Sequence, residues 1–257
     1  MKDPLIHTLA AALSVASLSL SVPASAAPQI FFGEDLSNGY PILNSHPHSD
    51  AAHSDFVDAI AGYQYGYDDL ESYAAGSRTP GTMALDFGNL GTLTLSGGYM
   101  VNAAAGSASS FPFSGTHYWE TNGSQNAQSL SQSFSFSQPV SGFGFYGSDF
   151  NDYTNPGSPT LATVYFADGT TSAYTIGSTS SPNGSALFWG FLSPDAQITG
   201  VTFADTLNRG DDWLGFDNFY VVGAPLSAVP EPGTLALFSL GLAGLAATRL
   251  RRRPRKG

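Results

Sequence analysis

Short segments in which apolar residues run together or alternate with polar ones recur along the middle of the chain. Such segments, bounded by Gly, Pro, Asn and Asp, are typical of β-strands. They lie at 29–32, 82–87, 90–95, 132–136, 140–146, 161–166, 171–176, 186–191, 197–203 and 214–222. Their spacing predicts an all-β fold, an antiparallel β-sandwich of jelly-roll, lectin-like type.

Two local patterns add detail to this sandwich. Residues 163–176 form two alternating segments around Asp168-Gly169, which suits a two-residue type I′ hairpin turn. Residues 49–60 have the spacing of one short helix, with Phe56 and Ile60 on the same face. Ser49 or the aspartate after it is expected to cap this helix.

The N-terminal end has the pattern of a secretory signal peptide. Lys2 precedes an apolar stretch at 5–22, and Ala24-Ser25-Ala26 offers a cleavage site for signal peptidase. The stretch is apolar on every side, which argues against an amphipathic helix of the fold. We therefore expect residues 1–26 to direct the chain to the secretory translocon and then to be removed.

The C-terminal end combines a short motif, a single hydrophobic helix and a basic cluster. The apolar run at 234–248 is shorter than the ~20 residues that usually span a membrane, but tilt and snorkelling arginines can close the gap. The positive-inside rule keeps the basic end, 249–257, in the cytoplasm. A buried core helix is the alternative reading. The arginines expected to anchor the tail are Arg249, Arg251, Arg252 and Arg253.

This tail resembles the PEP-CTERM sorting signal of Gram-negative bacteria that make extracellular polysaccharide. The resemblance rests on the order of the three parts of segment 229–257, and its motif is Val229, Pro230, Glu231, Pro232 and Gly233. It implies recognition by an exosortase, a membrane enzyme that cleaves near the motif. The exported domain, 27–228, would first be anchored at the inner membrane facing the periplasm. It would then reach the cell surface or the extracellular matrix.

A second resemblance covers nearly all of the exported domain. Segments 30–36, 117–121, 142–149 and 215–219 occur together in an order similar to that in a group of exported PEP-CTERM proteins. This resemblance implies a β-sandwich fold and an exported location, and no activity.

Charge and cysteine content narrow the possible partners. The whole chain carries −11, but residues 27–228 hold only two basic residues, Arg78 and Arg209, against eighteen acidic ones, which is −16. So acidic a domain repels nucleic acid and anionic lipid, which excludes nucleic-acid binding. The chain has no cysteine, so it contains neither disulfides nor thiol chemistry.

Acidic residues also suggest a structural calcium ion as cofactor. Asp149 and Asp152 lie in a polar loop directly after a predicted strand, and calcium accepts six to eight oxygen ligands in flexible geometry. An Asx-type turn is the alternative. By analogy with jelly-roll carbohydrate-binding modules, Glu71 and Asp217 form a second candidate pair.

The position of Asp217 in its strand bears on this pair. Strict alternation over 213–221 would place Asp217 on the same face as Phe219 and Val221. A carboxylate on a core face needs a partner, which a cation, the backbone or Arg209 would provide.

Aromatic residues are the candidates for carbohydrate contact. Tyr residues at 63, 65 and 67 share one face if that segment is a strand. Burial in the sandwich core is the alternative for at least half of the aromatic set. The candidates are Tyr63, Tyr65, Trp119, Tyr153 and Trp213, with Tyr67 and Tyr118 beside them.

Three histidines form a further candidate site, and the common catalytic motifs are absent from the sequence. His46, His48 and His53 resemble a small metal cluster, but solvated histidines of a polar loop are the preferred interpretation. The sequence has no Gly-x-Ser-x-Gly elbow, His-Glu-x-x-His motif or phosphate-binding glycine loop. With eighteen acidic residues, a glycosidase-like carboxylate pair would arise by chance.

The sequence therefore predicts a non-catalytic exported protein of the cell surface or matrix. Its expected activity is binding of exopolysaccharide by a calcium-stabilised module. Two other functions are compatible with the same features, namely a self-associating structural matrix protein and, less favoured, a polysaccharide-active enzyme.

Overall fold

The computed structural model describes residues 27–37, 43–76, 79–103, 109–122, 129–151, 159–177, 182–206 and 213–226. The predicted signal peptide and sorting tail lie outside these ranges, as do Asp152 and Tyr153. All ten predicted strands are confirmed, and β2 and β5 are additional. The elements are β1 (Gln29–Asp35), α1 (Pro47–Ile60), β2 (Tyr63–Asp68), β3 (Gly81–Asp86), the 3₁₀ turn η1 (Gly88–Leu90), β4 (Thr92–Asn102), β5 (His117–Asn122), β6 (Ser129–Val140), β7 (Gly142–Ser148), β8 (Thr160–Phe166), β9 (Thr171–Ile176), β10 (Ala186–Leu192), β11 (Ile198–Thr206) and β12 (Trp213–Pro225).

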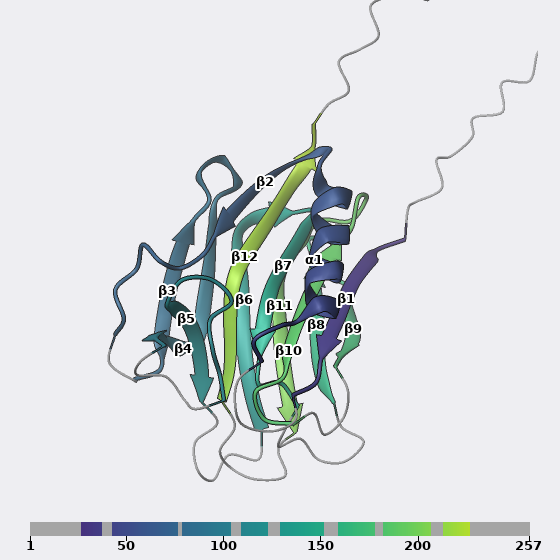
Figure 1. The fold of residues 1–257 in the computed structure, drawn as a ribbon. Helices are drawn as coiled ribbons and strands as arrows, with labels where there is room; N and C mark the ends of the chain where they lie inside the picture. The colour runs from purple at the N-terminus through teal and green to yellow at the C-terminus, as the bar shows by residue number, and fades with distance from the viewer. Residues whose placement is uncertain are drawn as a thin grey trace, which may run out of the picture.

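The strands form one antiparallel sheet that folds over on itself (Figure 1). Its order is β1-β10-β7-β12-β5-β4-β6-β11-β8-β9, with β2 paired to β12 and β3 paired to β4. Strands far apart in this order meet across the core. Phe134 of β6 contacts Phe216 and Phe219 of β12, with ring centroids 5.1 and 5.6 Å apart. The architecture is therefore the predicted antiparallel β-sandwich, nearly closed into a barrel.

The core between the two layers is dominated by aromatic rings. Phe145 of β7 contacts Phe203 of β11 and Phe216 of β12, both with ring centroids 5.0 to 5.1 Å apart. Trp189 of β10 is fully buried among them. Rings of this size bury a large apolar area and favour tilted and edge-to-face contacts such as these, so the domain has an adequate core without disulfides.

Helix α1 starts two residues earlier than predicted, and its N-terminus is capped by a different residue. Pro47 occupies the first turn, where its missing N–H costs nothing. The carboxylate of Asp35, at the end of β1, accepts the backbone N–H groups of His48 and Ser49 at 3.1 and 2.8 Å. The predicted caps, Ser49 and Asp50, were wrong because a cap can come from a distant strand as well as from the preceding residue.

The predicted apolar face of α1 is confirmed, and it covers the outer face of the sheet. Ala52, Phe56 and Ile60 are buried against β10, β7 and β12. The Phe56 ring lies directly over Gly144 and Gly190, where a Cβ atom would come within 3.0 and 2.7 Å of the ring. These two glycines let the helix approach the sheet, and the contact forms a second, smaller hydrophobic core.

The hairpin between β8 and β9 is confirmed, but its turn is longer than predicted. The backbone N–H of Phe166 donates to the carbonyl of Thr170 at 2.9 Å, so three residues lie between the paired positions. Gly169 has φ +86°, the left-handed conformation that a three-residue hairpin loop requires at that place.

A β-bulge in β12 overturns the predicted alternation around Asp217. Asp217 is opposite Tyr146 on β7, whereas Tyr220 is opposite Gly144, so β12 contains one extra residue. Asn218 absorbs this residue with φ +54°. Asp217 therefore does not share the core face of Phe219.

Candidate functional site

Asp217 holds the segment that precedes β5. The bulge turns its carboxylate toward residues 113–114, whose backbone N–H groups donate to Oδ2 at 2.7 and 2.9 Å. The N–H of Asn218 donates to Oδ1 at 2.7 Å. Burial raises the pKa of Asp217 to about 7, although the N–H donors act in the opposite direction. The backbone is thus the partner that this carboxylate has in the described residues.

Glu71 holds the same segment a few residues further on. Its Oε1 accepts the backbone N–H groups of Thr116 and His117 at 2.7 and 2.6 Å. Partial desolvation acts to raise the pKa of Glu71, but hydrogen bonds from these two residues hold it below its ordinary value. The structure therefore brings the predicted pair, Glu71 and Asp217, to one segment. Calcium there stays a prediction.

Asp149 directly follows β7, and it also binds backbone. It is buried, has φ +66°, and its Oδ1 accepts the N–H of Gly184 at 2.8 Å. Its predicted partner Asp152 is outside the described ranges. Within those ranges, no three side chains of His, Asp or Glu are grouped to hold a metal ion.

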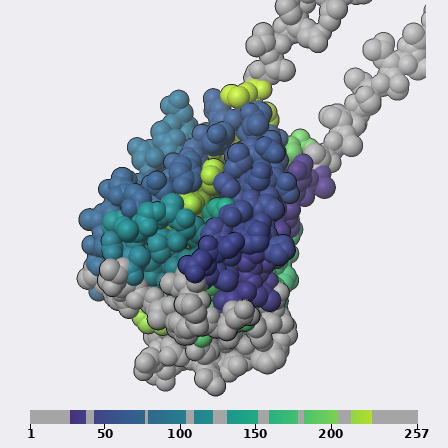
Figure 2. Space-filling model, in the orientation of Figure 1, coloured from purple at the N-terminus to yellow at the C-terminus, as the bar shows by residue number. Residues whose placement is uncertain are grey.

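Aromatic side chains from five segments meet between α1, β2 and the segment before β5. The rings of Tyr67 and Tyr220 are 4.9 Å apart, and those of Phe113 and Tyr146 stack at 4.6 Å. His53 of α1 lies between Tyr146 and Tyr220, at 5.2 and 5.3 Å. We call these five residues the aromatic patch. In Figure 2, yellow-green atoms of β12 are visible between the blue residues of α1 and β2 and the teal residues before β5.

Hydrogen bonds fix the polar groups of the aromatic patch. His53 Nε2 lies 2.8 Å from the Tyr220 hydroxyl, and the Tyr146 hydroxyl donates to Asp50 Oδ1 at 2.9 Å. The Tyr67 hydroxyl donates to Asn218 Oδ1 at 2.8 Å. The patch thus combines ring faces with preorganised hydroxyl, imidazole, amide and carboxylate groups.

The pKa values of these groups suit neutral hydrogen bonding. Burial raises the pKa of Tyr67 and of Tyr146, and it raises the pKa of Tyr220 to about 12. Burial also lowers the pKa of His53, against the opposing effect of Asp50. Neutral phenols and a neutral imidazole both donate and accept hydrogen bonds.

The structure separates the predicted carbohydrate-contact residues into exposed and buried groups. Tyr65 and Tyr67 are 50% and 45% exposed, and Tyr63 is half-buried against the base of α1. Trp119 is only 2% exposed and belongs to the core, so its ring offers no face to a sugar. Trp213 is half-buried and packs against a small hydrophobic cluster made of Tyr99, Val101 and Tyr118.

The histidine interpretation needs a correction as well. His48 and His53 are on α1 and not in a loop, and His46 directly precedes it. His46 Nδ1 lies 2.9 Å from Asp50, and His48 Nδ1 lies 2.7 Å from Asp35. These histidines therefore pair with carboxylates of the fold, and His53 joins the aromatic patch.

Sequence reasoning missed Tyr146, Tyr220 and Phe113 as site residues. Alternation in β7 does place Tyr146 on the face opposite Phe143 and Phe145, which is a usable signal. For Tyr220 the bulge removes that signal, because the alternation changes phase before it.

Comparisons with solved structures find small β-domains at low similarity. The cleaved adhesin domain K2 of Lys-gingipain aligns with 11% identity and TM-score 0.39, over 62% of this chain and 99% of that domain. A variant of a family 29 carbohydrate-binding module aligns with 14% identity and TM-score 0.31, over 66% and 100%. The xylan-binding domain CBM22-1 of Paenibacillus barcinonensis Xyn10C aligns with 14% identity and TM-score 0.32, over 62% and 97%. These scores are too low to assign a ligand.

The sequence comparisons assign the tail. No curated protein matches the chain. Within the described ranges no helix is long and apolar enough to span a membrane, and the predicted helix at 234–248 lies outside them. A family model, the PEP-CTERM protein-sorting motif, matches residues 228–253, which confirms the predicted motif and implies secretion with exosortase processing. The chain therefore carries a PEP-CTERM protein-sorting motif and is sorted as an exosortase substrate.

Proposed function

We propose that the exported domain is a non-catalytic carbohydrate-binding module whose contact surface is formed by the exposed rings of Tyr65 and Tyr67 on β2, with the buried Tyr146 and Tyr220 of the aromatic patch packed beside them. The observation that carries this proposal is the exposure of Tyr65 and Tyr67 on one face of β2, beside hydrogen-bonding groups already held in place. A tyrosine ring offers an apolar face and a polar edge, which matches the alternating C–H and O–H surfaces of a sugar. Ligand sites commonly combine such faces with a few fixed polar groups.

A groove beside Tyr65 extends this surface along the free side of β2. It has a volume of about 290 Å³ and is lined by Gln64, Tyr65, Phe87, Asn89 and Leu90. Two aromatic rings and two amides are neutral groups that bind hydroxyls without attracting ions. This groove supports sugar binding rather than acid–base catalysis.

The proposed location follows from the sorting motif. The domain would first face the periplasm of a Gram-negative cell while the tail holds it at the inner membrane. Exosortase cleavage would then release it to the cell surface or matrix, where extracellular polysaccharide is the available ligand.

We expect Tyr65→Ala and Tyr67→Ala each to weaken polysaccharide binding about tenfold, because each removes an exposed ring worth roughly 1.4 kcal/mol. Binding would be found on a glycan array and measured by calorimetry with the best oligosaccharide. Tyr165→Ala is the matched control, since Tyr165 is 42% exposed on β8 of the other layer. An array with no hits would reject the proposed function. Equal losses of affinity for all three variants would show that the sugar does not bind at Tyr65 and Tyr67.

We further propose that calcium stabilises the domain at the carboxylates of Glu71 and Asp217. The two carboxylates repel one another, since Glu71 contributes to the raised pKa of Asp217, and a cation between them would relieve the repulsion. Backbone carbonyls and water would have to complete the coordination.

Calcium at a hundredfold excess over its Kd should raise the free energy of unfolding by about 2.7 kcal/mol. Thermal melting of residues 27–228 with calcium or with a chelator measures this effect. Glu71→Gln should remove the increment, whereas Asp168→Asn, which changes an exposed turn carboxylate, should keep it. Identical melting curves with calcium and with chelator would reject the calcium site.

A further inference from the structure

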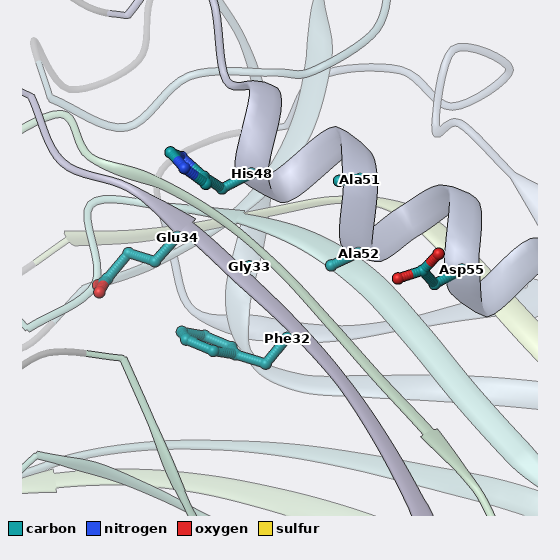
Figure 3. A pocket seen from close by; sticks show the side chains of 7 residues that line it. All are labelled: Phe32, Gly33, Glu34, His48, Ala51, Ala52 and Asp55. Carbon is teal, nitrogen blue, oxygen red and sulfur yellow. The ribbon is translucent and has the colours of Figure 1, made fainter.

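A second concave surface lies on the other side of α1, between the helix and β1. It has a volume of about 440 Å³. Figure 3 shows Phe32 and Glu34 projecting from β1, and His48 and Asp55 from α1. Two alanines of α1 and Gly33 complete the lining.

The close approach of α1 to β1 creates this groove. A Cβ atom at position 33 would lie 2.0 Å from the backbone carbonyl oxygen of His48, so only glycine fits there. The first turn of the helix is held at this point by Asp35, which also pairs with His48. The groove is therefore built by fixed contacts of the fold.

The groove offers an apolar platform. Phe32 is 42% exposed, although its neighbour across the strands, Trp189, is fully buried. The difference arises because β1 is at the end of the strand order, where no further strand of the described residues covers it. An exposed ring beside a groove is also the feature found at Tyr65 of β2.

Among the described residues, carboxylates dominate the charge around the groove, and His48, which pairs with Asp35, is the one basic side chain of its lining. Glu34 and Asp55 are at its rim, and Asp50 and Asp58 lie on the exposed side of the same helix. Every Lys and Arg of the chain lies outside the described residues. Anionic sugars are disfavoured here, whereas an ammonium group gains from nearby carboxylates and from an aromatic face.

We propose that the groove between β1 and α1 is a second polysaccharide subsite, and that it takes an amine-bearing sugar. The sugar ring would lie on Phe32, and its ammonium group would contact Asp55. This inference rests on the proposed function. Helix α1 forms one wall of the groove and one wall of the aromatic patch. A polymer that crosses α1 would contact the groove and the aromatic patch together.

The test compares a glucosamine oligosaccharide with its N-acetylated counterpart, by calorimetry on the exported domain near pH 6, where the amines are protonated. The wild-type domain should bind the amine form at least tenfold more tightly. Asp55→Asn should remove most of that preference and leave the N-acetylated oligomer unaffected. Asp58→Asn makes the same change in net charge outside the groove and should keep the preference. Phe32→Ala should weaken both ligands.

Several outcomes would overturn the subsite. Equal effects of Asp55→Asn and Asp58→Asn would show unspecific attraction to an acidic domain. Binding of poly-L-lysine with the same dependence on Phe32 and Asp55 would indicate a basic peptide as the occupant. Binding of neutral sugars that depends on Tyr65 but shows no preference for amines would reject only this inference. No binding of any polysaccharide would reject the proposed function itself. Circular dichroism of each variant confirms that it is folded.

Discussion

Replacing Asp217 with alanine is expected to lower the free energy of unfolding by about 3 kcal/mol, because three buried or half-buried N–H donors lose their acceptor at roughly 1 kcal/mol each. These donors belong to Phe113, Ser114 and Asn218. The segment before β5 should loosen with them, so the Phe113 side of the aromatic patch loses its position. Urea denaturation at pH 6 measures the loss.

Two further variants, Asp217→Asn and Asp58→Asn, test whether the loss of stability comes from the missing hydrogen-bond acceptor or from the change in charge. The asparagine at 217 keeps one acceptor oxygen for the segment and should cost less than alanine. Asp58 is exposed on α1 and its replacement should change stability by less than about 0.5 kcal/mol. A cost for Asp217→Ala no larger than that for Asp58→Asn would contradict the structural role.

The same residue should give the domain an unusual dependence on pH. The pKa of Asp217 is about 7 in the folded state and near 4 in an unfolded chain, so folding favours the protonated form. Its stabilising contribution is complete below about pH 4 and is lost as the pH rises through about 7. The stability of the wild-type domain should therefore fall over this window relative to Asp217→Asn. Parallel pH profiles for the two proteins would contradict the shift, and bound calcium should flatten the wild-type profile.

The second large effect is expected at Phe56, where α1 packs against the sheet. Phe56→Ala should cost about 3 to 5 kcal/mol, because Phe56 is fully buried and its removal leaves a cavity between helix and sheet. Its ring contacts Phe31, Phe188 and Tyr220 at centroid distances of 5.4 to 5.8 Å. Chemical denaturation measures the cost.

Because α1 carries His53 and Asp55, its loosening should also weaken sugar binding on both of its sides. Phe32→Ala is the control for stability, since that ring is already exposed and its loss should cost less than about 1 kcal/mol. A cost for Phe56→Ala as small as that of the control would show that α1 contributes little to the fold.

Part of the candidate site could be predicted from the sequence. The spacing of Tyr63, Tyr65 and Tyr67 predicts three rings on one face of a strand, and β2 has that form. The exposure of Tyr65 and the burial of Trp119 were not readable, because aromatic residues serve cores and binding surfaces equally well. Only the neighbours of a ring in space decide between the two.

The pairing of carboxylates shows the same limit. Glu71 and Asp217 were expected to act together, and they do hold one segment. The expected geometry at Asp217 was wrong, since one extra residue at the bulge turns the side chain away from the core. The capping of α1 by Asp35 could not be predicted from the sequence, because it depends on how α1 packs against β1.

The sequence alone determined ten strands, the helix, the strongly acidic exported domain and the sorting motif, since each depends on local periodicity, composition or a contiguous signal. The tertiary structure alone decided which rings are exposed, where Asp217 points, and that α1 lies between an aromatic patch and an acidic groove. These features depend on strand order, on one bulge and on contacts between residues more than a hundred positions apart, such as Tyr220 with His53. Periodicity along a chain carries no information about such contacts, because it fixes the face of an element but not the element that covers it.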